Sequence, residues 1–129
     1  MNHRKIFLTK KFNFEAAHNL TNYNGKCENL HGHSYALEVT ISGYPDKNGM
    51  VMDFKILEQI VNAEIIDFLD HSYLNEKPGL ENATSENIIM WAWSKLELVF
   101  LKIKYLKVDL EKMRLFETKS SFVEIKKNF

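Results

Sequence analysis

The sequence contains little cysteine, proline or glycine, and it has no excess of charge of either sign. Its single cysteine, Cys27, cannot form a disulfide within the chain, which excludes disulfide scaffolds and agrees with a reducing compartment. Lysine and arginine together number 17, as do aspartate and glutamate, so the basic excess of a nucleic-acid-binding domain is absent. No apolar run approaches the roughly 20 residues of a membrane helix. We therefore expect neither nucleic acid nor a membrane as a partner.

The start of the chain and its length suggest a location and a number of domains. The stretch MNHRKIFLTKKF is positively charged, but no apolar segment or small-residue cleavage site of a signal peptide follows it. We therefore expect a cytoplasmic protein. A chain of 129 residues can bury a core of its own and is too short for two independent ones, which predicts one domain over residues 1–129.

Two segments alternate between apolar and polar residues with the period of a β-strand. The first runs from Ile6 to His18, and the second runs from about His31 to Gly43. One face of the second strand combines histidines with apolar side chains: His31, His33, Tyr35, Leu37, Val39 and Ile41. The alternation therefore predicts that both histidines point in the same direction.

The middle of the chain changes to helical spacing. Apolar residues recur with that spacing from about Phe54 to Leu69 and again from about Ser85 to Lys102, where Thr84 or Ser85 can cap the helix start. Two further strands are predicted near Tyr105 to Phe116 and from Ser121 to Lys127. The order ββααββ favours an α+β fold in which helices cover one face of an antiparallel four-stranded sheet.

The histidines are the first candidates for chemistry. His31 and His33 share a strand face, and His18 ends another strand whose face could lie beside them. Three histidines can bind zinc and leave one coordination position open, as in catalytic sites. The spacing alone is equally compatible with histidines that end an apolar face and hydrogen-bond to the backbone.

Cys27 lies in the polar loop NYNGKCEN and has more than one interpretation. A lone cysteine is most often a small buried hydrophobic residue. Beside a metal it could be a fourth ligand, or a thiolate that removes a proton, because a nearby cation lowers the thiol pKa from about 8.5 toward neutrality.

Two acidic positions have functional and ordinary interpretations as well. Asp70 and His71 at the end of the first helix offer a carboxylate beside an imidazole, which could relay protons or simply end the helix. Glu117 follows Met113 and Leu115 on one strand face. If buried, its carboxylate could accept two parallel hydrogen bonds from the amidine-like edge of a pterin or guanine; if exposed, it only ends the strand.

Six short motifs occur in an order that matches one family: FNFEAAHNL, CENLHGHSY, GMVMDF, LDHSYLN, ATSEN and LFETKSS. From about Phe12 to Glu117 the chain closely resembles the 6-pyruvoyl-tetrahydropterin synthase and 6-carboxy-tetrahydropterin synthase family. The resemblance implies the tunnelling fold, whose subunits form a β-barrel. It also implies a homohexamer, a dimer of trimers, with active sites between subunits.

The resemblance implies a role for each of the motif residues. The zinc (Zn²⁺) ligands fall on His18, His31 and His33. Residues that transfer protons fall on Cys27, Asp70 and His71. Residues that contact the pterin fall on Glu117, which anchors the ring, and on Thr84 and Ser85.

The implied activity is that of a zinc-dependent lyase acting on 7,8-dihydroneopterin triphosphate. The compact length favours the branch that forms 6-carboxy-5,6,7,8-tetrahydropterin by proton shuttling, triphosphate elimination and loss of side-chain carbons, on the route to queuosine and other 7-deazapurines. An alternative branch forms 6-pyruvoyl-tetrahydropterin. A variant group has glutamate at the spacing of Glu28 and forms 6-hydroxymethyl-dihydropterin for folate. A non-catalytic module that binds pterin or purine would require loss of a proton-transfer residue, and none is missing.

Overall fold

The fold is built on an open sheet of five strands, in a computed structural model that describes residues 3–20 and 29–128. In spatial order the strands are β3 (Ser72–Tyr73), β1 (Ile6–His18), β2 (His31–Gly43), β4 (Asp109–Thr118) and β5 (Ser121–Lys126). The pairs β1–β2, β2–β4 and β4–β5 are antiparallel. The four predicted strands are therefore present, and among the described residues the sheet does not close on itself.

The sheet differs from the prediction at its edge and at the start of β4. A short fifth strand, β3, runs parallel to β1, with Ala16 opposite Ser72. Two residues are too few to show alternation, so the sequence pattern missed this strand. The strand predicted from Tyr105 begins later, because Lys104–Leu106 form a 3₁₀ turn, η4, and Lys107 is left-handed with φ 53°.

Two helical segments agree with the prediction. The first consists of α1 (Phe54–Val61), a π-helical stretch η2 (Asn62–Ile66) and α2 (Asp67–Leu69), which follow one another without a break. The second is α3 (Ser85–Lys102). Each start is capped by a side chain, since Asp53 accepts a hydrogen bond from the Lys55 amide and Thr84 accepts one from the Asn87 amide.

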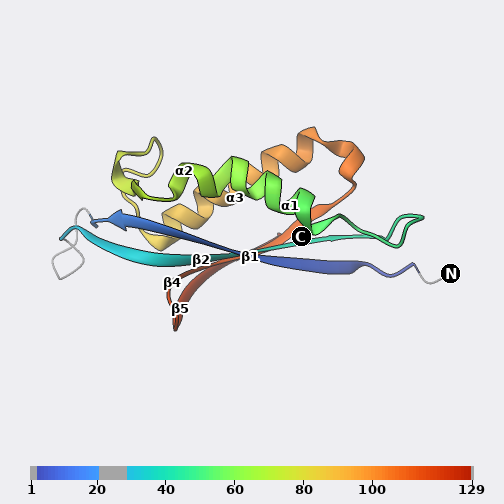
Figure 1. Ribbon diagram of the computed structural model, residues 1–129, viewed down its shortest axis with the longest axis horizontal. Helices are drawn as coiled ribbons and strands as arrows, with labels where there is room; N and C mark the ends of the chain where they lie inside the picture. Colours follow the sequence, from blue (N-terminus) through green and yellow to red (C-terminus); the bar gives the residue numbers. More distant parts are fainter. Residues whose placement is uncertain (1–2, 21–28, 129) are drawn as a thin grey trace.

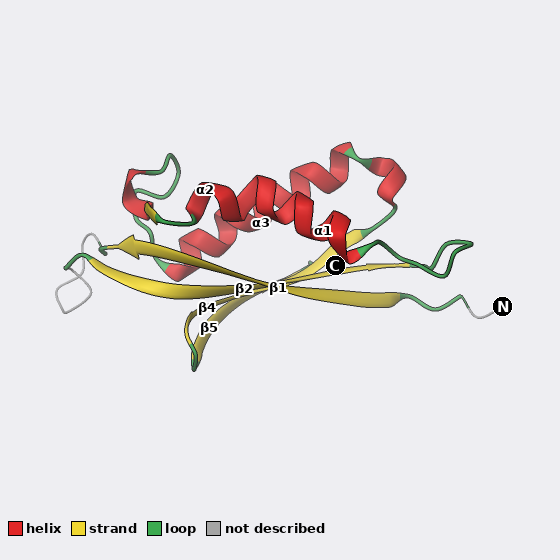
Figure 2. Ribbon diagram, in the orientation of Figure 1, coloured by secondary structure: helices red, strands yellow, loops and turns green. Residues whose placement is uncertain are grey.

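Both helical segments lie over the same face of the sheet, while β4 and β5 curl away from the long β1–β2 ribbon (Figure 1; Figure 2). The core fills the space between the two layers. From the sheet it takes alternate residues of β1, β2 and β4, chiefly Phe12, Phe14, Tyr35, Leu37, Val39, Ile41, Met113 and Leu115. From the helices it takes one stripe each, chiefly Leu57, Val61, Ile65, Leu69, Ile88, Ala92 and Leu96. The histidines of β1 and β2 continue this covered face.

Among the described residues, no helix combines the length and the apolar character that would let it cross a membrane.

Candidate active site

Three histidines gather where β1 ends and β2 begins. His18, the last residue of β1, lies opposite His31, the first residue of β2, and His33 lies opposite Ala16. Because side chains alternate along a strand, the three imidazoles emerge on the same face. Their potential ligand atoms all lie within 4.8 Å of one another. The structure thus brings together the three residues that the sequence predicted as a cluster.

Backbone carbonyls orient two of these rings. His18 Nδ1 lies 2.7 Å from the Ala83 carbonyl oxygen, and His31 Nδ1 lies 2.7 Å from that of Asn29. Since a carbonyl oxygen only accepts hydrogen bonds, each Nδ1 carries the proton and each Nε2 presents a lone pair. The two Nε2 atoms are 2.9 Å apart. Two lone pairs at that distance repel each other, which a shared proton or a bound cation would relieve.

The third ring also offers a free nitrogen. His33 Nε2 is buried and has no hydrogen-bond partner among residues 3–20 and 29–128, although Glu117 Oε1 lies 3.6 Å away. Burial lowers the pKa of His33, although the negative charge of Glu117 acts in the opposite direction. The lowered pKa favours the neutral ring. An unpartnered buried nitrogen is costly unless something binds it. Three converging imidazole nitrogens therefore fit a divalent transition metal such as zinc.

Glu117 joins this group from the end of β4. Its Oε2 accepts a hydrogen bond of 2.6 Å from the Ser85 hydroxyl in the first turn of α3. Thr84, the preceding residue, uses its side chain to cap the helix. Sequence reasoning left the cap open between these two residues, and the structure separates them: Thr84 caps the helix, and Ser85 orients the Glu117 carboxylate.

Tyr35 lies beneath the histidines and was not predicted as part of the site. Its side chain is fully buried, and its hydroxyl lies 3.3 Å from His18 Nδ1. Burial, and then the charge of Glu117, raise the pKa of Tyr35, so the hydroxyl stays protonated. The ring lies edge-on to both His18 and His33. The period-two series that predicted His31 and His33 continues to Tyr35 and could have identified it.

Asp70 and His71 lie at the edge of β1. Asp70 Oδ1 accepts a hydrogen bond of 2.8 Å from the Glu15 amide, and the His71 amide donates one of 2.5 Å to the Glu15 carbonyl. His71 Nδ1 lies 3.0 Å from Asp70 Oδ2, and the His71 side chain is 80% exposed. The Glu15 amide, and then His71, hold the pKa of Asp70 below its usual value. The pair is thus an exposed dyad fixed by the strand backbone.

The dyad and the histidine cluster are not joined within the described part of the chain by a hydrogen bond or an ion pair. His33 and His71 both line an open hollow of about 550 Å³, together with Glu15, Ser34 and neighbouring residues. The Ser34 hydroxyl is hydrogen-bonded to the Glu15 carboxylate there. Cys27 and Glu28, the other predicted catalytic positions, lie outside the described residues.

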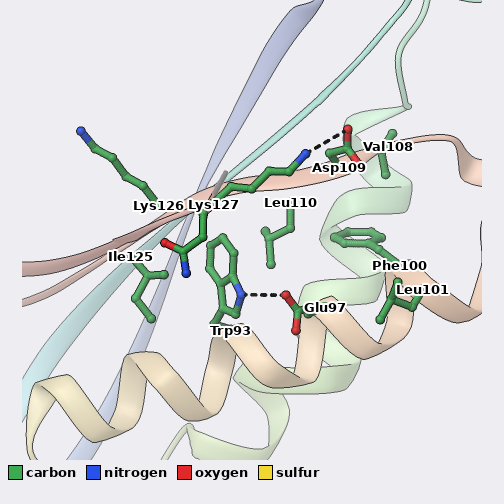
Figure 3. A pocket seen from close by; sticks show the side chains of 11 residues that line it. Trp93, Glu97, Phe100, Leu101, Val108, Asp109, Leu110, Ile125, Lys126 and Lys127 are labelled. Carbon is green, nitrogen blue, oxygen red and sulfur yellow. Dashed lines mark hydrogen bonds and ion pairs between the residues drawn. The ribbon is translucent and has the colours of Figure 1, made fainter.

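A separate cavity of about 360 Å³ lies between α3 and the strands β4 and β5 (Figure 3). Trp93 donates a hydrogen bond to Glu97 on its helix side, and Lys127 pairs with Asp109 on its sheet side. None of the residues predicted for catalysis, metal or pterin binding lines this cavity. The candidate active site is therefore the histidine cluster with Glu117 and Ser85.

Comparison with known proteins finds relatives that match most of this chain. The family model described as 6-pyruvoyl tetrahydropterin synthase matches residues 7–128. A 6-carboxy-5,6,7,8-tetrahydropterin synthase of Synechocystis sp. is 44% identical over 93 residues, which cover 68% of this chain and 72% of that protein. The corresponding synthase of Haemophilus influenzae is 33% identical over 91% of this chain and 96% of its own.

A solved structure shows the same fold. The 6-pyruvoyl tetrahydropterin synthase of Caenorhabditis elegans superposes with a TM-score of 0.84 at 26% identity, covering 99% of this chain and 100% of that one. The matched relatives are named as tetrahydropterin synthases, which are lyases. The chain belongs to the 6-pyruvoyl tetrahydropterin synthase family.

Proposed function

We propose that this chain is a single-domain, cytoplasmic, zinc-dependent lyase that converts 7,8-dihydroneopterin triphosphate to 6-carboxy-5,6,7,8-tetrahydropterin, a step toward 7-deazapurines. The observation that carries the proposal is the convergence of three histidine nitrogens within 4.8 Å, with the Glu117 carboxylate beside them. A metal site next to a ring-anchoring carboxylate suits a substrate that has both a planar base edge and side-chain hydroxyls. The names of the relatives from Synechocystis and Haemophilus support the carboxy product.

In this proposal the covered face binds the metal and the pterin ring. His18, His31 and His33 hold zinc, which when bound supplies a Lewis acid that polarises side-chain hydroxyls. Glu117 accepts two hydrogen bonds from the pterin edge, with Ser85 fixing the carboxylate and Thr84 adjoining the ring. Such anchoring keeps the reacting carbons at a constant position relative to the histidines.

Proton transfer is assigned to Cys27, Asp70 and His71. As a thiolate, Cys27 removes and returns protons at carbons of the substrate side chain. The Asp70 carboxylate, held by the Glu15 amide, lies beside the His71 imidazole and keeps it oriented. Glu28 is the second candidate base, because it has the glutamate spacing of the variant group that forms 6-hydroxymethyl-dihydropterin.

We further propose that the site is completed by a second copy of the chain, in a homohexamer built as a dimer of trimers. Residues 6–15 of β1 have no strand on their outer side in the described chain, and β5 is the opposite outer strand. A row of alternating charge crosses the sheet between these edges, in the order Lys11, Glu38, Arg114 and Glu124. Its outer members are oppositely charged, so the edges are complementary when copies join into a barrel.

Complementation tests the shared site. His31→Ala and His71→Ala should each be inactive alone, since one lacks a metal ligand and the other lacks half of the dyad. Unfolding and refolding the two variants together should restore activity in sites that combine an intact cluster with an intact dyad. If each variant assembles normally but the mixture stays inactive, both parts of a site come from one chain.

Product analysis tests the proposed reaction. Incubation of the zinc-loaded protein with 7,8-dihydroneopterin triphosphate, followed by mass spectrometry, should yield 6-carboxy-tetrahydropterin. A pyruvoyl product would favour the activity named for the Caenorhabditis elegans protein, and a hydroxymethyl product would favour Glu28 as the base. Protein that binds the pterin without any product is a binding module. Protein that needs zinc to fold but ignores pterins has a structural metal site, and either result contradicts the proposal.

A further inference from the structure

The side chain of Asn75 hydrogen-bonds to two segments of backbone, at Asn19 and at Glu81. It belongs to the 3₁₀ turn η3 (Leu74–Glu76), within the motif LDHSYLN. Its Oδ1 accepts a hydrogen bond of 3.0 Å from the Asn19 amide. Its Nδ2 donates to the carbonyl oxygens of Asn19 at 2.8 Å and Glu81 at 2.9 Å. Both donors of the amide and one acceptor position are therefore used.

The first of these contacts fixes the backbone that follows His18. The parallel pairing of β1 with β3 ends at Ala17 and Tyr73, just before the histidine. Beyond that point Asn75 binds both the amide and the carbonyl of Asn19, as a neighbouring strand would. The Tyr73 hydroxyl donates to the Asn19 side chain in addition. The end of β1 is thus held although the strand beside it has stopped.

The second contact fixes the loop that supplies the hydrogen-bond acceptor of His18. The Glu81 carbonyl, which Asn75 binds, lies two residues before Ala83. Ala83 is fully buried, and its carbonyl oxygen lies 2.7 Å from His18 Nδ1. One side chain therefore ties together the two segments that must stay in register for this hydrogen bond to form.

We propose that Asn75 is a positioning residue of the histidine cluster, which keeps His18 Nδ1 on the Ala83 carbonyl and so keeps Nε2 free to bind a metal. The inference rests on the proposed metal centre. Partners that orient a ligating histidine typically contribute about 10–100-fold to metal affinity. Since Asn75 acts through the Ala83 loop and the β1 backbone, the lower end, about tenfold, is expected.

Two variants test this role. Asn75→Ala removes all three hydrogen bonds, whereas Asn75→Asp keeps the shape and the acceptor but loses both donors. Asn48→Ala is the matched control, because Asn48 is exposed in a turn and its side chain has no hydrogen bond within the described chain. Affinity is measured by competition of Co²⁺ and Zn²⁺ with a chelator. Both Asn75 variants should bind about tenfold more weakly than wild type, and the control should match wild type.

NMR spectra of the histidine ring nitrogens in the metal-free protein distinguish a specific effect on His18 from general destabilisation. In wild type, His18 and His31 should each show a single tautomer with the proton on Nδ1. In the Asn75 variants His18 should become a mixture while His31, whose acceptor is the Asn29 carbonyl, stays unchanged. Wild-type metal affinity, or equal changes at His18 and His31, would overturn the inference. Wild-type protein that binds neither metal would instead refute the proposed function.

Discussion

Replacement of Glu117 by alanine is expected to weaken pterin binding strongly. The carboxylate accepts one hydrogen bond from Ser85 on Oε2, and its Oε1 faces His33 Nε2 at 3.6 Å. An ionised carboxylate has about four lone-pair positions on its two oxygens. Ser85 therefore leaves an acceptor position on each oxygen, and two parallel donors of a pterin edge can occupy them together.

The magnitude follows from the two hydrogen bonds that alanine would remove. A hydrogen bond to a charged group contributes about 1.5–3 kcal/mol, so two contribute roughly 3–6 kcal/mol. At about 1.4 kcal/mol for each factor of ten, the loss is roughly 10²–10⁴-fold in affinity. The Glu117 side chain is 30% exposed, so water competes for it, and we expect the lower limit of that range.

Calorimetric titration with a pterin that lacks the triphosphate would measure this loss. Glu117→Gln should bind nearly as weakly as Glu117→Ala, because the amide turns one acceptor into a donor that faces a donor of the ring. Ser85→Ala keeps both acceptors and should lose about tenfold at most, through a less fixed carboxylate. Zinc content is the control. Unchanged pterin affinity in Glu117→Ala, with zinc retained, would refute the anchoring role.

Three further predictions concern the metal, the dyad and a helix cap. Cys27→Ala should abolish turnover yet retain zinc, while His31→Ala should lose zinc. Activity assays and metal analysis of both variants check this. If Cys27→Ala remained active, Glu28 would replace Cys27 as the proposed base. The lowered pKa of Asp70 means that its ionised form stabilises the fold above the unfolded pKa of about 3.9, and that this stability is lost as the pH falls through the folded pKa. Thermal melts should therefore separate wild type from Asp70→Asn near neutrality and converge in acid; a constant gap would contradict this. Thr84→Ala should lower the free energy of unfolding by about 1 kcal/mol through loss of the helix cap, as measured by denaturant unfolding. An unchanged free energy of unfolding would mean that Thr84 is not the stabilising cap.

The main elements of the fold follow from hydrophobic periodicity alone. Alternation located β1 and β2 with their ends, because one face of each strand is buried under the helices. The helical stripes located both helical segments for the same reason. Periodicity failed where an element is too short to show a period, as in β3, and where the chain turns before it pairs. The strand predicted from about Tyr105 begins only at Asp109, because the backbone closes a 3₁₀ turn at Lys104–Leu106.

The histidine cluster was predictable in its side chains but not in its backbone contacts. The alternation of side chains along the strands put His31 and His33 on one face, with His18 as a possible third member. In the structure the potential ligand atoms of all three lie within 4.8 Å of one another. The acceptors that orient His18 and His31 are the carbonyls of Ala83 and Asn29. Every residue carries a backbone carbonyl, so the residue types at these two positions do not indicate that their carbonyls bind a histidine. Only the folded loop decides which carbonyl meets an imidazole.

The difference between side-chain and backbone contacts also explains why the histidine cluster and the Asp70–His71 dyad are not directly bonded within the described chain. Alternation directs His18, His31 and His33 toward the covered face, where burial lowers the pKa of His33 and so favours its neutral ring. Asp70 and His71 instead bind the Glu15 backbone, whose amide and carbonyl point sideways from the strand. A group held in that direction lies at the sheet edge and faces whatever joins that edge. The exposed, ordered dyad at the outer edge of β1 thus supports the proposal that a neighbouring copy completes each site.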